Sequence, residues 1–244
     1  MIDIAKLETE FGKIEVVKYR AKGLLYYLQG GCFQSEADSD GISMAPYIHA
    51  IHGLLAQAQA HDVLMIGCGG GSLGTMLAKA ARRVTIVDKN PASFRMAHDY
   101  FSLPLTIECH VADGKDFLCA TAHRYDAIVL DAFDGDRIPQ HLQTLDFFRL
   151  VQSRLDRSHG CLFANVHVLH DLDRTPDRYA AAARCSWNDV RLLDTQGVIG
   201  RNALVLAGNV RALQKPTLLM PPRSHRGAIA AELEKMTFRP LHLS

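Results

Sequence analysis

The chain has 244 residues, of which 48% are hydrophobic and 22% are charged, and its net charge is +1. This composition excludes a disordered chain, which could not bury enough apolar surface to offset its ordering entropy. The balanced charge gives no electrostatic case for a nucleic-acid partner, because nucleic-acid-binding domains usually carry a basic stripe. No apolar run reaches the ~18 residues of a transmembrane helix, so we expect no membrane partner.

The cysteines and the N-terminal residues bear on the cellular compartment. The first residues include acidic side chains and no apolar core segment, so we expect no secretory signal. None of the six cysteines forms a C-x-x-C pair, which argues against zinc-ribbon and thioredoxin-type sites. His167 and His170 have a spacing that a metal could use, but no third ligand accompanies them. We therefore expect free thiols, a cytoplasmic protein and no metal.

Residues 1–42 are expected to form a small antiparallel β module. Short β-prone runs at 13–19 and 23–29 surround a turn-like segment. Apolar positions at helical spacing then predict a helix over 43–58. This helix is taken as the start of a second domain that spans residues 43–210.

From residue 61 onward, short apolar strands alternate with helical segments. Strands are predicted at 63–66, 84–87, 105–111, 127–130 and 161–166, and helices at 73–82, 92–101 and 145–155. This alternation is typical of an α/β protein with a parallel sheet covered on both faces. Further strands are predicted at 190–193 and 203–207. Residues 211–244 are predicted to form a peripheral C-terminal tail with a helix at 227–236.

A glycine loop follows the first strand of the predicted sheet, as Gly67-Cys68-Gly69-Gly70-Gly71. In open α/β sheets, ligands bind at the carboxyl ends of the strands. Glycines let the backbone approach a ligand closely, and the helix that follows offers free N–H groups. Asp88 ends the next strand, about 20 residues further on, where a carboxylate can accept hydrogen bonds from both hydroxyls of a ribose. Both features are shared with NAD enzymes, so they predict only a nucleoside.

The carboxylate after the third strand narrows the choice of nucleoside. Asp113-Gly114 stands there, and Asp113 could accept a hydrogen bond from an adenine amino group. The order of glycine loop, Asp88 and Asp113 favours an adenosyl-sulfonium nucleoside over NAD. In the alternative interpretation, Asp88 caps the helix before Pro91 and Asp113 is a turn residue.

The densest acidic feature is Asp131-Ala132-Phe133-Asp134-Gly135-Asp136, at the end of the fourth strand. Carboxylates this close together repel one another unless a cation binds among them. The segment therefore predicts a small-molecule amine as a partner. One of the carboxylates could also take a proton from the attacking ammonium, as a general base. A solvated turn is the alternative.

Together these residues resemble the spermidine synthase (polyamine aminopropyltransferase) family, over about residues 14–208. The glycine loop and the Asp-Ala-Phe segment look most like the divergent spermidine synthase-like members. The resemblance implies a Rossmann-like, methyltransferase-type doubly wound sheet behind a small N-terminal antiparallel β module, in a homodimer. It also implies polyamine biosynthesis, by transfer of an aminopropyl group from decarboxylated S-adenosylmethionine to an amine such as putrescine.

The resemblance assigns roles to individual positions. The donor contacts that it implies are Gln34, Gly67, Gly69, Gly71, Asp88, Asp113 and Gly114. Asp131 corresponds to the proposed general base of the family, and Tyr47 and Asp134 correspond to residues that bind the amine. The expected co-substrate is decarboxylated S-adenosylmethionine or S-adenosylmethionine, with no metal.

Four positions depart from the family pattern. Gly70 stands where the family has an Asp that helps to bind the donor's amino group, and His49 stands at an acidic position. Ala132 and Phe133 replace two small hydroxyl residues. Each change removes polarity around the amine end of the pocket. Two alternatives therefore stay open: an S-adenosylmethionine-dependent methyltransferase, and a nucleoside-binding protein without catalysis.

Overall fold

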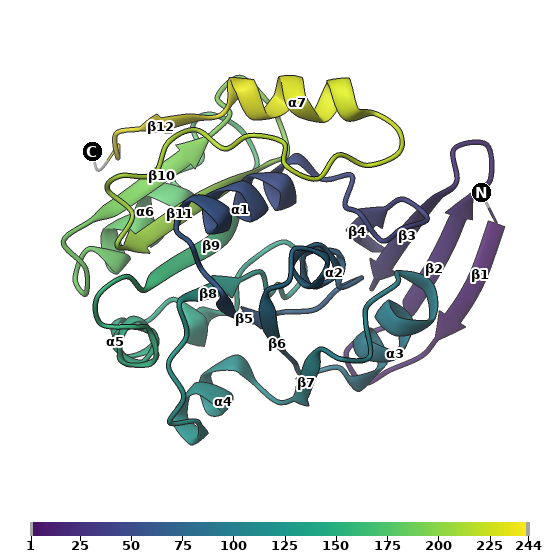
Figure 1. The fold of residues 1–244 in the computed structure, drawn as a ribbon, viewed down its shortest axis with the longest axis horizontal. Coiled ribbons are helices and arrows are strands. Elements are labelled where there is room, and N and C mark those ends of the chain that lie inside the picture. Colours follow the sequence, from purple (N-terminus) through teal and green to yellow (C-terminus); the bar gives the residue numbers. More distant parts are fainter. Residues whose placement is uncertain (1, 243–244) are drawn as a thin grey trace.

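The N-terminal module is a four-stranded antiparallel sheet (Figure 1). The computed structural model describes residues 2–242. The strands, in spatial order, are β1 (Ile2–Leu7), β2 (Ile14–Tyr19), β3 (Leu24–Gln29) and β4 (Cys32–Ala37). β2 and β3, whose inward side chains are buried, agree with the strands predicted from the sequence. β1 and β4 were not predicted, because these edge strands are largely exposed and carry little apolar periodicity.

The main sheet has eight strands in the order β12-β10-β11-β9-β8-β5-β6-β7. The neighbouring pairs from β9 to β7 are parallel, which confirms the predicted doubly wound α/β core. β10, β11 and β12 add antiparallel strands beyond β9, so the sheet as a whole is mixed. The strand bounds are β5 (Asp62–Ile66), β6 (Arg83–Asp88), β7 (Glu108–Val111), β8 (Ala127–Leu130), β9 (Cys161–Val168), β10 (Val190–Asp194), β11 (Arg201–Gly208) and β12 (Thr237–Arg239).

Helices cover both faces of the main sheet because its strands alternate between two apolar cores. Val63 and Met65 of β5 pack into one core, and Leu64 and Ile66 pack into the other. On the first face lie α1 (Pro46–Gln57), α2 (Ser72–Lys79), α3 (Pro91–Tyr100) and α7 (Arg226–Lys235). On the second lie α4 (Gly114–Ala120), α5 (Leu145–Arg154) and α6 (Thr175–Ala183), with a short 3-10 helix at Gln140–Leu142. No helix in residues 2–242 is long and apolar enough to cross a bilayer.

The β module is attached to the main domain through α3. Met96 and Phe101 pack with Val16 and Tyr27 of the module in a separate apolar cluster. The Tyr27 hydroxyl lies 3.0 Å from the Ser93 hydroxyl in the same interface. This attachment places β4 over the carboxyl ends of the parallel strands.

The C-terminal segment is part of the fold, so the prediction of a peripheral tail was wrong. β12 pairs with β10, and Leu233 of α7 is buried against α1 in the first core. The guanidinium of Arg239 contacts Asp177 at 2.8 Å and Asp194 at 2.9 Å. Figure 1 shows α7 alongside α1. The helix predicted at 227–236 is present as α7, but the sequence does not predict how it packs or that β12 pairs, because α7 is only weakly amphipathic and β12 is short.

Candidate active site

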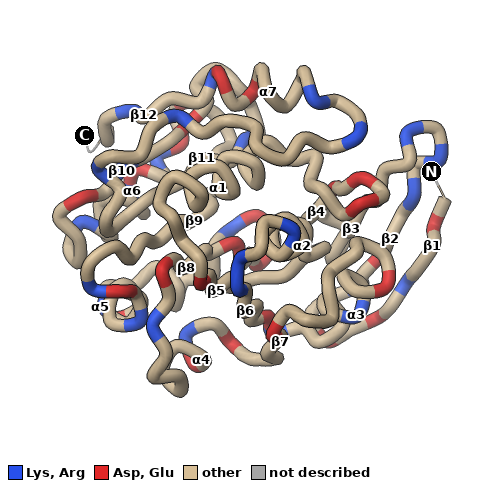
Figure 2. Tube along the Cα trace, viewed as in Figure 1, with Lys and Arg blue, Asp and Glu red and all other residues tan. Residues whose placement is uncertain are grey.

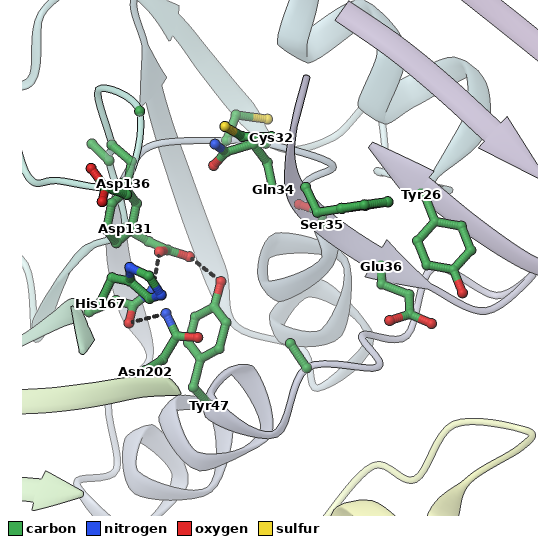
Figure 3. Close-up of a pocket in the computed structure, with 18 of the residues that line it drawn as sticks. Tyr26, Cys32, Gln34, Ser35, Glu36, Tyr47, Asp131, Asp136, His167 and Asn202 are labelled. Atoms are coloured by element: carbon green, nitrogen blue, oxygen red, sulfur yellow. Dashed lines mark hydrogen bonds between the residues drawn. The ribbon is translucent and has the colours of Figure 1, made fainter. Parts of the chain in front are cut away.

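A cavity of about 780 Å³ opens between the carboxyl ends of the parallel strands and the β module. Its wall is formed by the glycine loop, the segment after β8, β9, the start of β11, β4 and the start of α1. This volume is typical of a site for a small molecule or cofactor. Figure 3 shows side chains from the module and from the main domain facing each other across it.

Asp131 lies at the end of β8, where its backbone N–H continues the sheet ladder to the Ile66 carbonyl at 2.9 Å. The Tyr47 hydroxyl donates to Asp131 Oδ2 at 3.2 Å, and Asn165 Nδ2 donates to Oδ1 at 2.8 Å (Figure 3). Burial raises the pKa of Asp131, and the two hydrogen bonds partly oppose this by favouring the ionised form. A carboxylate with a raised pKa inside a cavity is suited to accept a proton.

Two amides that were not predicted from the sequence orient Asp131. Asn165 lies on the buried strand β9, and its Oδ1 accepts a hydrogen bond from Asn202 Nδ2 at 2.9 Å. That bond directs the Asn165 NH₂ group towards the carboxylate. Both amides line the cavity. The sequence does contain a signal for Asn165. An Asn inside the apolar run 161–166 is expected to be buried, and a buried amide needs a polar partner.

The glycine loop is held close to Asp131 and Asp88. Gly67 has a φ of +103°, and a Cβ there would collide with the backbone oxygen of Asp131, so the approach requires glycine. Asp88 accepts hydrogen bonds from Cys68 N–H and Asn90 N–H, each at 2.8 Å. Burial raises the pKa of Asp88. Asn90, not Asp88, caps α3, and this leaves the Asp88 side chain on the cavity wall.

Gly70 is closed in by its neighbours. Its N–H donates to Ser35 Oγ of β4 at 2.9 Å. A Cβ at Gly70 would lie 3.1 Å from both the Phe101 ring and the Ser35 Cβ. A side chain at this position would therefore require Ser35 or Phe101 to move by a few tenths of an ångström.

Asp113 and Gly114 lie outside the cavity wall. Asp113 caps α4 by accepting from Lys115 N–H at 2.8 Å, and its other oxygen lies 2.9 Å from His141 Nε2. Burial acts to raise the pKa of Asp113, but the hydrogen bonds from Lys115 and His141 outweigh it and lower the pKa. Gly114 packs against the Ile66 side chain. The pair thus has a structural role of the kind that the turn interpretation anticipated.

The structure brings part of the predicted site together. The predicted residues that line the cavity are Gln34, Tyr47, Gly69, Asp88 and Asp131. Gly67 and Gly71 shape the loop beneath it, Gly71 at a φ of +69° before α2. Asp134 is exposed and does not line the cavity, whereas Asp136 does.

The cavity wall carries negative charge. Its acidic members are Glu36, Asp88, Asp131 and Asp136. Among the described residues, no lysine or arginine lines it, and His167 is its one basic side chain. Over the molecule as a whole, acidic and basic residues are interspersed (Figure 2). The wall is therefore a local feature, and it favours a cationic ligand.

Comparison with known proteins identifies the relatives of the chain. A family model described as a methyltransferase domain matches residues 63–149. The polyamine aminopropyltransferase of Vibrio vulnificus is 33% identical over 129 residues, which cover 50% of this chain and 43% of that protein. The match thus spans less than half the length of this curated relative.

Solved structures extend the likeness to nearly the whole chain. A probable spermidine synthase from Corynebacterium glutamicum has a TM-score of 0.78 at 18% identity, and the match covers 97% of this chain and 90% of that one. A spermidine synthase in complex with the transition-state analogue AdoDATO has a TM-score of 0.68 at 15% identity, over 95% and 88% of the two chains. These likenesses confirm the expected methyltransferase-type Rossmann-like fold with its small antiparallel module. The chain is thus similar in sequence to a polyamine aminopropyltransferase over half of its length, and its fold is similar to that of spermidine synthase structures over nearly all of it.

Proposed function

We propose that this protein transfers an aminopropyl group from decarboxylated S-adenosylmethionine to a small amine, with Asp131 as the general base. The observation that carries the proposal is the acidic cavity, which contains no lysine or arginine among the described lining residues. The carboxylate of S-adenosylmethionine would face like charges there without a cationic partner. The decarboxylated donor keeps the sulfonium and the ammonium of S-adenosylmethionine and lacks this carboxylate.

The proposed reaction needs little more than alignment and a proton acceptor. The amine nitrogen attacks the aminopropyl carbon that is bonded to the sulfonium. The bond between this carbon and the sulfur breaks, and methylthioadenosine leaves as a neutral thioether. Alkylamines have pKa values near that of lysine, about 10.4, so the bound amine must first lose a proton. Asp131 is the acceptor, held in place by Tyr47 and Asn165. Correct alignment of the two reactants can contribute about 7–11 kcal/mol.

The lining residues support a position for the donor. We place the adenosine at the end of the cavity formed by Gly69 and Asp88, with Gln34 across from it on β4. Tyr47 and Asp131 then face the reacting amine. The adenine contact of Asp113 and the amine contact of Asp134 stay predictions, since neither residue lines this cavity.

The direct test is a product assay with purified protein. The protein is incubated with decarboxylated S-adenosylmethionine and a panel of mono-, di- and triamines, and mass spectrometry measures methylthioadenosine and aminopropylated amine. We expect both products in equal amounts with at least one amine, and none with the Asp131→Asn variant. Absence of both products across the panel, with the donor shown to bind, would contradict the proposal.

A methyltransferase is the second candidate, and two observations favour it. The matching family model is a methyltransferase domain, and Gly70 leaves the loop without a carboxylate for the donor's amino group. A parallel assay with S-adenosylmethionine distinguishes the two reactions, because methyl transfer releases S-adenosylhomocysteine instead of methylthioadenosine. A protein that binds the nucleoside and releases neither product would be a binding protein.

A cytoplasmic homodimer acting in polyamine biosynthesis completes the proposal. The homodimer and the pathway are supported by the resemblance to the family, and the cytoplasmic location by the spacing of the cysteines. Light scattering on the purified protein tests the oligomeric state, with twice the chain mass of 27.0 kDa expected for a dimer.

A further inference from the structure

The β-module wall of the cavity contains a carboxylate that the proposed chemistry does not use. Glu36 on β4 is half-buried and lines the cavity. Figure 3 shows it on the opposite side of the cavity from Asp131. No lysine or arginine accompanies it among the lining residues that the structure describes. A half-buried carboxylate facing a cavity attracts a cation, because burial strengthens its electrostatic interactions.

An aromatic ring lies beside this carboxylate, and a second ring packs against the first. Tyr26 on β3 is directly opposite Glu36 in the strand register, and both line the cavity. Phe33 packs edge-on against Tyr26 with 5.7 Å between ring centroids and an interplanar angle of 73°. Burial, together with the neighbouring Glu36 carboxylate, raises the pKa of Tyr26 to about 12, so its hydroxyl stays neutral.

The exposure of Phe33 is the second observation that points to a ligand. Phe33 lines the cavity, yet its side chain is 63% exposed. A pair of packed aromatic rings with a carboxylate next to one of them can bind an alkylammonium in two ways, by cation–π attraction and by charge-assisted hydrogen bonds. We propose that Glu36, Tyr26 and Phe33 form an alkylammonium subsite on the side of the cavity away from Asp131.

This inference deepens the proposed function and rests on it for the identity of the ligand. The glycine loop does not supply a carboxylate for this group, because Gly70 has no side chain and packs against Ser35 and Phe101. Two ligands carry the required group: the donor, through its aminopropyl ammonium, and a diamine acceptor, through the ammonium far from the reacting nitrogen. Both would place an ammonium at Glu36 while the reaction takes place at Asp131.

Calorimetry with matched probes separates the two sources. The donor pair is S-adenosyl-3-thiopropylamine and methylthioadenosine, two neutral thioethers of which only the first has an ammonium. The acceptor pair is 1,4-diaminobutane and butylamine. Each probe is titrated into the wild type, Glu36→Gln, Phe33→Leu and the control Glu10→Gln, which changes an exposed glutamate of the same module outside the cavity.

We expect Glu36→Gln to weaken the probe with the additional ammonium by about tenfold in one of the two pairs, and to leave its partner unchanged. The affected pair identifies the source of the ammonium. Phe33→Leu should weaken the same probe by a smaller factor and, since the ring is exposed, should fold even if Glu36→Gln does not. Glu10→Gln should change neither pair.

The subsite is overturned if Glu36→Gln and Phe33→Leu change neither pair more than Glu10→Gln does. It is also overturned if neither probe with the additional ammonium binds the wild type more tightly than its partner. The proposed function fails separately, when the wild type shows the expected binding ratios but releases no methylthioadenosine in the product assay.

Discussion

Asp131 and Asp113 both follow strands of the parallel sheet, yet their surroundings differ sharply. Asp131 lines the cavity and is contacted by two neutral groups, the Tyr47 hydroxyl and the Asn165 amide. Asp113 lies outside the cavity, caps α4 and is paired with His141. Burial raises the pKa of Asp131, whereas hydrogen bonds overcome burial and lower the pKa of Asp113.

This comparison shows what the position at a strand end does and does not determine. The parallel sheet brings such residues to the edge where ligands bind. The hydrogen-bond partners of each carboxylate then determine whether its charge is available to a ligand. Neutral partners leave the charge of Asp131 available to a cationic ligand, whereas a helix N-terminus and a histidine already engage the charge of Asp113.

The largest expected effect is that of Asp131→Asn. The substitution keeps the size of the side chain and removes the proton acceptor, so turnover should fall by about 100- to 10,000-fold. The affinity for methylthioadenosine should not change. Release of methylthioadenosine under saturating donor and amine measures the first effect, and calorimetry measures the second. Asp189→Asn, at an exposed aspartate outside the cavity, is the control. Turnover close to that of the control would remove Asp131 from its proposed role.

Asn165→Ala tests how the neutral partners of Asp131 work. The Asn165 hydrogen bond lowers the pKa of Asp131, so its loss should raise that pKa further. Because the base must be ionised, the acidic limb of the pH–rate profile should move to higher pH, and turnover at neutral pH should fall by about tenfold. Asn202→Ala removes only the outer amide and should shift the limb less. A lower rate with an unmoved limb would contradict this account of Asn165.

Substitutions at Asp136 and Asp134 can be compared to test which of the two carboxylates binds the amine. Asp136 lines the cavity and Asp134 does not, although both belong to the same acidic loop. We expect Asp136→Asn to raise the KM for the amine severalfold and Asp134→Asn to leave it nearly unchanged. The effect is modest because the Asp136 side chain is 58% exposed and its charge is screened by solvent. A larger rise in KM for Asp134→Asn would restore the role that the family resemblance implies.

The smallest effect is expected at Asp113, and it concerns stability. Asp113→Ala removes the cap of α4 and should lower the free energy of unfolding by about 1 kcal/mol. Asn can also cap a helix, so Asp113→Asn should cost less. Because the folded-state pKa of Asp113 is lowered, its charge stabilises the protein above the ordinary carboxyl pKa, and this contribution disappears as the pH falls through the lowered value.

Chemical denaturation at neutral and acidic pH checks these stabilities, and the difference between wild type and Asp113→Asn should shrink in acid. The affinity of both variants for methylthioadenosine should stay close to that of the wild type. A loss of about tenfold in both would instead support the predicted contact between Asp113 and adenine.

Much of the core of the fold could be predicted from the sequence because its strands are short apolar runs separated by helical periods. The bounds of β7 were predicted less well. The strand predicted at 105–111 begins only at Glu108 in the structure, and Leu105 is 86% exposed. The edge strands β1 and β4 and the C-terminal β12 were missed as strands. Their stability comes from pairing with neighbours, which leaves little periodic signal in the chain itself.

The site residues that could be predicted from the sequence are those at the ends of strands and those in the glycine loop. That reasoning located Asp131, Asp88 and Gly69 on the cavity wall. It could not find Glu36 or Asn202, because their place in the site depends on how β4 and β11 pack against the parallel strands. Such packing depends on contacts between segments far apart in the chain.

The most direct test of the central claim is a calorimetric comparison of decarboxylated S-adenosylmethionine with S-adenosylmethionine on the wild type. The two donors differ only by the carboxylate, so the comparison measures how the acidic cavity treats a negative charge on the ligand. We predict that the decarboxylated donor binds at least about tenfold more tightly, which corresponds to about 1.4 kcal/mol. Equal affinities, or tighter binding of S-adenosylmethionine, would contradict the account and support the methyltransferase alternative.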